Sequence, residues 1–202
     1  MKLFYSPGAC SLAPHIVARE AGHEIDLVKV DIPNKKTNDG SDYWQVNPKG
    51  YVPALLLDNG QVITEVGVIC QYLADQRPES GLLPPFGGLD RYQHMEAINF
   101  AATEVHKQIG ALFNPMLTPE MKQIQKSVIE RRLNALEGML QGKEYIMGDR
   151  FSAADAYLFT VLNWTKIHNI EVDKWPNIQA FMNRVALRPK VQEALKAEGL
   201  LA

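Results

Sequence analysis

The first third of the chain alternates between apolar patterns typical of strands and patterns typical of helices. Between two of the strands, Asp58-Asn59-Gly60 is a strong signal for a hairpin turn. Ser11 is placed to cap the first helix, and the apolar positions from Val66 to Leu73 recur at i, i+3, i+4 and i+7 in the second. The order β-α-β and then β-β-α predicts a small mixed sheet flanked by helices. Strands are predicted over Lys2–Ser6, Ile25–Asp31, Ala54–Leu57 and Gln61–Ile63, and helices over Ser11–Ala21 and Glu65–Gln76.

Every periodic segment beyond residue 90 is typical of a helix. The two parts are separated by residues 75–90, which hold three prolines and three glycines, more than a helix or a sheet tolerates. We therefore predict a sheet domain over residues 1–80, a linker over 81–89 and an all-helical domain over 90–202. The helix signals in the last part are Arg91–Phe113, Pro119–Leu140 led in by Thr118, a capping-box pattern at Ser152-Ala-Ala-Asp155, and boundaries at Trp175-Pro176 and Arg188-Pro189.

Composition narrows the class of protein. Of 202 residues, 46% are hydrophobic and 22% charged, which is typical of folded globular proteins and excludes disorder for most of the chain. The formal net charge of -2 argues against a protein that coats nucleic acid. Only 2 cysteines are present, so no disulfide framework is expected. Apolar runs fall far short of the ~18 residues of a membrane helix, and we expect a cytoplasmic protein without membrane or nucleic-acid partners.

The first candidate for chemistry is Tyr5-Ser-Pro-Gly-Ala-Cys10-Ser11, where a strand leads through a loop into a helix. The positive end of that helix favours a thiolate at Cys10 or another bound anion. An ordinary loop with a small buried cysteine explains the pattern equally well. No second cysteine lies nearby, which argues against a dithiol oxidoreductase.

The other candidate positions each have an ordinary structural explanation beside the functional one. Val52-Pro53 opens a strand, where a proline is allowed, and a cis bond would turn the Val52 backbone outward to pair with an extended ligand. Glu65 either complements a helix dipole or holds an ammonium group beside free N–H groups. Cys70 lies on an apolar helix face and is predicted to be core, and no metal-ligand cluster is found. A helix face that either lines a cleft or faces solvent is formed by Asn99, Thr103, His106 and Gly110.

The order of these signals resembles the thioredoxin-like domain of glutathione transferases followed by their all-helical domain. The details are similar to the bacterial beta class, and the resemblance spans essentially the whole chain. The motifs that carry it are Tyr5–Ser11, Asn47-Pro-Lys-Gly-Tyr-Val-Pro53, Thr103-Glu-Val-His-Lys107 and Phe151-Ser-Ala-Ala-Asp155-Ala-Tyr-Leu-Phe.

The resemblance implies that glutathione, a tripeptide thiol, is the co-substrate and that no metal is used. Cys10 would lie beside the glutathione sulfur, and Ser11 would donate a hydrogen bond to the thiolate. Tyr5 matches the tyrosine that other classes use for thiol activation. Lowering a thiol pKa by ~2 units takes about 2.7 kcal/mol, which a helix N-terminus and a charge-assisted hydrogen bond supply together. We expect Ser11, the Cys10 amide and His106 to provide these interactions.

The resemblance also implies how the rest of glutathione is held. Lys35 would pair with the glycyl carboxylate, and Val52, presented by a cis Pro53, would bind the cysteinyl part. Glu65 would hold the γ-glutamyl ammonium and the backbone N–H of Val66 its carboxylate. Some contacts would come from the partner subunit of a homodimer. The helical domain would close the site with Asn99, Thr103, Glu104, Val105 and His106.

One departure from the family pattern is Val66, because the family usually has Ser or Gly after this glutamate. Val66 lacks a hydroxyl and its branched side chain crowds the site, so we expect weaker glutathione binding. The leading hypothesis is an enzyme of the detoxification type that conjugates glutathione to small hydrophobic electrophiles. Two alternatives stay open: a glutathione-dependent thiol-disulfide reductase or dehalogenase acting through a Cys10 mixed disulfide, and a non-catalytic ligand-binding scaffold.

Overall fold

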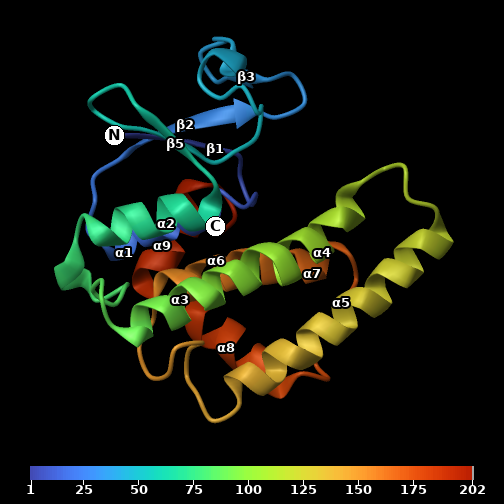
Figure 1. Cartoon of the computed structure of the whole chain (residues 1–202). Coiled ribbons are helices and arrows are strands. Elements are labelled where there is room, and N and C mark those ends of the chain that lie inside the picture. Colours follow the sequence, from blue (N-terminus) through green and yellow to red (C-terminus); the bar gives the residue numbers. More distant parts are fainter. Residues whose placement is uncertain (202) are drawn as a thin grey trace.

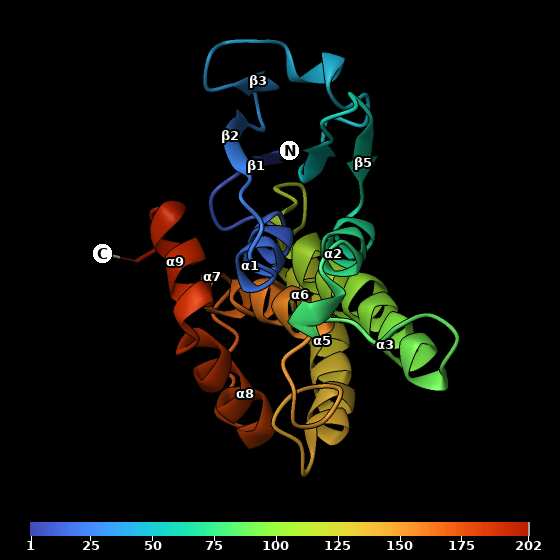
Figure 2. The ribbon, with the colours of Figure 1, turned by 90° about the vertical axis from the view of Figure 1, so that its left-hand side faces the viewer.

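A five-stranded sheet and a bundle of helices lie at opposite ends of the molecule, with α1 and α2 between them (Figures 1 and 2). The computed structural model describes residues 1–201. The sheet unit contains β1 (Lys2–Tyr5), α1 (Leu12–Glu20), β2 (Asp26–Asp31), β3 (Lys36–Thr37), β4 (Ala54–Leu56), β5 (Val62–Thr64) and α2 (Val66–Asp75). The helical unit contains α3 (Leu89–Phe100), a π-helical stretch Ala101–His106, α4 (Lys107–Gly110), α5 (Pro119–Leu140), α6 (Ala153–Leu162), α7 (Trp164–Ile167), α8 (Pro176–Ala186) and α9 (Pro189–Ala197).

The strands follow the order β3-β2-β1-β4-β5, and β1 runs parallel to β2 but antiparallel to β4. Successive side chains of β1 point to opposite faces, so Leu3 joins the large core with the helices while Phe4 joins a smaller cluster on the other face. The predicted mixed sheet is therefore confirmed. Strand β3 was not predicted, because two residues cannot display an alternating pattern.

Helices α1 and α2 pack side by side beneath the sheet and contact the helical unit through α6 (Figure 2). Both helices contribute apolar side chains to the large core cluster. Cys70 on α2 is fully buried there, as predicted for a core position. One continuous apolar core therefore joins the sheet unit to the helical unit.

Helix starts in the second half follow their sequence signals. The hydroxyl of Thr118 accepts a hydrogen bond from the Met121 N–H at 3.3 Å, and α8 and α9 begin at prolines. Asp155 accepts from the Ser152 N–H at 2.8 Å, which confirms the predicted capping box. Ser11 is the N-cap residue of α1, as predicted, but its side chain makes no capping hydrogen bond to the helix.

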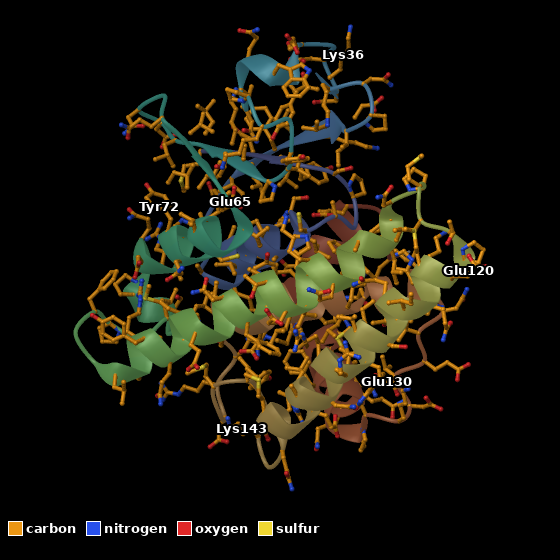
Figure 3. All side chains as sticks on the ribbon, turned by 45° about the vertical axis from the view of Figure 1, so that its right-hand side comes forward. Lys36, Glu65, Tyr72, Glu120, Glu130 and Lys143 are labelled. Atoms are coloured by element: carbon orange, nitrogen blue, oxygen red, sulfur yellow. The ribbon has the colours of Figure 1, made fainter. Side chains whose placement is uncertain are left out.

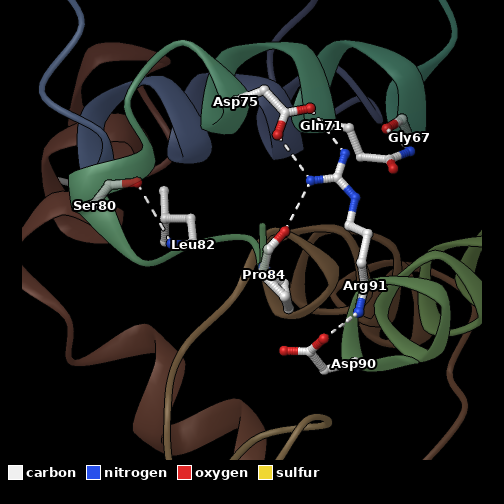
Figure 4. Close-up of polar contacts among 8 residues, drawn as sticks. All are labelled: Gly67, Gln71, Asp75, Ser80, Leu82, Pro84, Asp90 and Arg91. Atoms are coloured by element: carbon white, nitrogen blue, oxygen red, sulfur yellow. Dashed lines mark hydrogen bonds and ion pairs between the residues drawn. The ribbon is translucent and has the colours of Figure 1, made fainter. Parts of the chain in front are cut away.

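A buried arginine joins the end of α2 to the start of α3 (Figure 4). The Arg91 guanidinium, on a residue only 2% exposed, donates to both carboxylate oxygens of Asp75 at 2.8 Å and to Pro84 O at 3.0 Å. The ring of Phe86 lies 3.9 Å from the guanidinium carbon. Arg91 therefore fixes the connecting segment around Pro84 against the end of α2 and the start of α3. Among residues 1–201, no helix is both long and apolar enough to cross a membrane.

Candidate active site

A cleft lies between the sheet unit and the helical unit at the N-terminal ends of α1 and α2. Figure 3 shows Glu65 at the entry to α2, on the side of the sheet unit that faces the helices. The polar part of the cleft has a volume of about 230 Å³ and the apolar part about 530 Å³. The residues that line both parts are Cys10, Tyr51, Val52 and His106.

Cys10 is partly buried in the floor of the cleft, and its thiol donates a hydrogen bond to Val52 O at 3.3 Å. Burial raises the pKa of this thiol to about 12, more than the nearby backbone N–H groups and Lys107 lower it. Cys10 is therefore a neutral thiol at pH 7. Of the two interpretations of this loop, a buried neutral cysteine agrees with the structure and a thiolate at the helix end does not, because desolvation outweighs the helix dipole.

Glu65 presents its carboxylate at the rim of the polar part. Its backbone has φ 72°, a region that residues other than glycine rarely adopt and that is concentrated at functional sites. The carboxylate lies 2.7 Å from the ammonium of Lys49, which also donates to the Thr64 hydroxyl at 3.0 Å. The side chains of Glu65 and Lys49 are 67% and 53% exposed, so a ligand reaches both of them.

Val52, Pro53 and Val66 form the wall of the polar part. The peptide bond between Val52 and Pro53 is cis. Tyr51, the residue before Val52, is held by two side chains: the Tyr43 hydroxyl and the Asn47 amide both donate to its carbonyl oxygen at 2.7 Å. The Val66 side chain is buried in the core cluster and also lines the cleft.

His106 lies at the junction of the two parts of the cleft. Burial, and then the neighbouring Lys107, lowers the pKa of His106 to about 4 against the opposing effect of Glu65. The imidazole is therefore neutral at pH 7. Its Nδ1 lies 2.7 Å from the Tyr157 hydroxyl, and its ring packs edge-on against Trp164 with 5.0 Å between centroids.

The apolar part of the cleft is walled by residues from both units and from the C-terminal segment. Trp164 forms one wall, and its indole N–H donates to Gly8 O at 2.9 Å, which ties the loop before Cys10 to α7. The other apolar side chains there include Ile32, Phe113, Ile167 and Leu200. Among residues 1–201, no acidic side chain and no lysine or arginine lines this part, so it suits an uncharged molecule.

Three candidates from the sheet unit do not line the cleft. The hydroxyl of Ser11 is buried and donates to Ser6 O at 3.2 Å, so it is directed away from the predicted thiolate. Tyr5 is buried beside His15, with 6.4 Å between ring centroids. Lys35 donates to Gly50 O at 2.8 Å, and its ammonium lies over the rings of Trp44 and Tyr51.

The predicted polar helix face is divided by the structure. A π-helical turn holds more residues than an α-helical turn, so the spacing expected from 3.6 residues fails over Ala101–His106. Asn99 and Thr103 are exposed outside the cleft, and Glu104 lies 2.7 Å from Arg132 Nε. The side chain of Val105 is buried in the core. Of the candidates on this helix, the cleft contains His106 and Gly110, and Ala102 and Lys107 lie beside them.

Two family models match the chain. The model described as the N-terminal domain of glutathione S-transferase matches residues 1–75, and the model of the C-terminal domain matches residues 100–189. The chain belongs to the glutathione S-transferase family. The predicted architecture, a thioredoxin-like α+β domain followed by an all-α domain, is confirmed by this membership and by the structure.

Relatives in this family cover the whole chain. A glutathione S-transferase named GstA from Escherichia coli O157:H7 is 48% identical over 200 residues, which is 99% of this chain and 100% of that protein. A Sphingomonas chungbukensis structure described as a bacterial beta class glutathione S-transferase is 46% identical, with a TM-score of 0.96 over 100% of both chains. A sphingomonad glutathione S-transferase complexed with glutathione is 45% identical, again with a TM-score of 0.96 over 100% of both chains. The chain is thus a glutathione S-transferase similar to the beta class, as the motifs indicated.

Several residues of this transferase cleft were missed by sequence reasoning. Lys49 and Tyr51 lie inside the motif that suggested the family, but only Val52 and Pro53 were taken from it. Lys107 directly follows His106, and Tyr157 lies within the motif around Asp155. Burial patterns alone could not single out Tyr157, because every residue of α6 is buried. Within residues 1–201, no group of three or more His, Cys, Asp or Glu side chains is arranged to hold a metal ion.

Proposed function

We propose that this protein conjugates the thiolate of glutathione to small, uncharged, apolar electrophiles. The observation that carries the proposal is the pair of adjoining cavities, one polar and one apolar, which share Cys10, Tyr51, Val52 and His106. A tripeptide with charged ends fits the polar part, and an apolar electrophile fits the other. The sulfur of the tripeptide would then lie at the boundary, where the two substrates react.

Glutathione would be held through its two charged ends and its backbone. Glu65 pairs with the γ-glutamyl ammonium, and the Val66 N–H at the start of α2 binds the adjacent carboxylate. The Val52 backbone pairs with the cysteinyl residue. For the glycyl carboxylate we propose Lys35, which lies outside the cleft lining but over the ring of Tyr51, a residue that lines it; the ammonium has three donors, and Gly50 O uses one of them.

The glutathione thiol would be activated by hydrogen bonds rather than by a base. The Ser11 hydroxyl is engaged by Ser6 and does not contribute. The remaining donors are the N–H groups at the start of α1, His106 and the charge of Lys107. A helix N-terminus contributes about 0.3–1 kcal/mol and a hydrogen bond to a charged group about 1.5–3 kcal/mol. Together they reach the roughly 2.7 kcal/mol that a shift of ~2 pKa units requires.

We further propose a homodimer in which the partner subunit completes each site. Asn99 and Thr103 are exposed, and the Thr103 hydroxyl donates only to Asn99 O within residues 1–201. They are thus free to reach a ligand held by a second copy. The neighbouring Glu104, which pairs with Arg132 in its own chain, would contribute beside them. We also propose that the two domains span residues 1–80 and 90–202. The protein would act in the cytoplasm, in detoxification.

The redox alternative is disfavoured by a specific observation. Forming a mixed disulfide with glutathione requires a Cys10 thiolate that attacks a disulfide. Burial holds the pKa of Cys10 at about 12, and its S–H donates to Val52 O. The thiol is therefore a poor nucleophile at pH 7, and conjugation that leaves Cys10 unchanged is favoured.

Titration calorimetry with glutathione at pH 7 tests the proposal. We expect one site per chain with a Kd between about 1 µM and 1 mM. Glu65→Gln should weaken binding about tenfold or more through loss of the charged hydrogen bond, while Glu130→Gln, on the far surface of α5, should not. An aryl halide then tests conjugation. Binding without turnover would favour the scaffold alternative, and a folded protein without binding would exclude the proposal.

A further inference from the structure

The surroundings of His106 restrict both its orientation and its protonation. The ring is held between Tyr157, with 5.7 Å between centroids, and Trp164, both in edge-on contact. The charged groups that act on the ring are Lys107, next along the chain, and Glu65 from the sheet unit. The imidazole is neutral at pH 7, so only one of its two nitrogens carries a hydrogen.

The hydrogen-bond inventory around Tyr157 indicates which nitrogen that is. Tyr157 is 3% exposed, and burial keeps its phenol protonated by raising its pKa. Within residues 1–201, the hydroxyl has one hydrogen-bond partner, His106 Nδ1 at 2.7 Å. If Nδ1 donated to the phenol, the phenol hydrogen would have no acceptor within residues 1–201, which is unfavourable for a side chain that is 3% exposed. The hydroxyl therefore donates, and Nδ1 accepts.

We propose that Tyr157 is a positioning residue that holds His106 in the tautomer with its hydrogen on Nε2. This inference deepens the proposed function and rests on it for its catalytic consequence. Nε2 makes no hydrogen bond within residues 1–201, and it is absent from the buried nitrogens without a partner, so it is accessible. Because His106 lines both parts of the cleft, this N–H is available to a bound anion there.

The assignment determines what His106 does in conjugation. An Nε2–H donates a hydrogen bond to the thiolate sulfur and does not remove the proton from the thiol, which is released to solvent water. Without the Tyr157 hydroxyl, the ring would populate both tautomers, and in one of them Nε2 would repel the thiolate. The fixed tautomer thus stabilises the reactive form of glutathione before the electrophile arrives.

Tyr157→Phe tests the inference, because it retains the ring and removes only the hydroxyl. In the ligand-free protein, ¹⁵N NMR of the imidazoles should show hydrogen on Nε2 of His106, with the signal assigned by its loss in His106→Gln. Tyr157→Phe should show a mixture of tautomers. We expect kcat/KM to fall about tenfold and the rising limb of its pH profile to move to higher pH, with KM for glutathione little changed.

Tyr145→Phe is the matched control. Tyr145 is also buried, and its hydroxyl accepts from Arg188 at 3.3 Å, outside the cleft. This variant should keep the tautomer, the rate and the pH profile. Hydrogen on Nδ1 in the unmodified protein, or an unchanged tautomer and pH profile in Tyr157→Phe, would overturn the inference. The NMR result requires no glutathione, so failure of the proposed function is recognised separately by the absence of binding.

Discussion

The protonation state of Cys10 is the property that most clearly separates conjugation from disulfide chemistry. The thiol lies in the cleft floor, donates to Val52 O at 3.3 Å, and has its pKa raised by burial from 9.0 to about 12. The structure therefore predicts that Cys10 reacts slowly with a neutral alkylating reagent at pH 7. It also predicts that the reaction accelerates with pH without reaching a plateau below about pH 11.

The expected magnitude follows from these two pKa values. At pH 7 the thiolate fraction is about 10⁻⁵ for Cys10, against about 10⁻² for an ordinary cysteine, a ratio of about 10³. A thiolate of higher pKa is intrinsically more nucleophilic, with a Brønsted coefficient of about 0.4–0.5, which recovers a factor of about 15–30 over ~3 units. Alkylation of Cys10 should thus be about 30–60 times slower than that of an unhindered thiol, before steric shielding slows it further.

The assay is alkylation by iodoacetamide followed by mass spectrometry between pH 6 and pH 10, without glutathione. Cys70 is fully buried, and Cys10→Ala measures its contribution. The logarithm of the Cys10 rate should rise by one per pH unit over the whole range. A plateau of the alkylation rate below pH 8 would contradict this prediction, since it would demonstrate a thiolate stabilised by the helix end. In the same series, Cys10→Ala should retain conjugation within a few-fold.

Two further predictions concern glutathione affinity and folding. Val66→Ser should bind glutathione about fivefold more tightly by calorimetry, because a hydroxyl adds a hydrogen bond to the γ-glutamyl carboxylate. Val66→Ala removes the branched side chain without adding a hydroxyl. If this variant gains as much glutathione affinity as Val66→Ser, the cause is relief of crowding and not the added hydrogen bond. Asp75→Ala should lower the free energy of unfolding by about 3 kcal/mol in urea titrations, because it leaves the 2%-exposed Arg91 without a counter-charge. The double variant Asp75→Ala/Arg91→Leu should recover part of this loss, and strictly additive losses would contradict the ion-pair explanation.

Much of the fold could be predicted because its signals are local. Each of these signals depends on residues that are close together in the sequence. They are the hairpin turn at Asp58-Asn59-Gly60, the capping box at Ser152 and Asp155, and the prolines that begin α8 and α9. Strand β3 carries no such signal, because its two residues are positioned by pairing with β2 and by a bridge between Lys36 and Asp42. The family could also be recognised from the motifs, and the comparisons confirm it: the family models match residues 1–75 and 100–189, and GstA matches 99% of the chain.

The order of the elements, the family and the residue types available for chemistry could all be recognised from the sequence. Which of those residues meet, and in what protonation state, depends on how the chain packs in three dimensions. The helix end at Cys10 was compatible with a thiolate or with an ordinary buried cysteine, and burial decides between them by raising the pKa of Cys10 to about 12. His106 lies in the cleft but Asn99 and Thr103 do not, because the π-helical turn breaks the α-helical spacing that would place them on one face. Helical periodicity is a local property, whereas desolvation and contact depend on segments far apart in the chain, such as Tyr157 and His106.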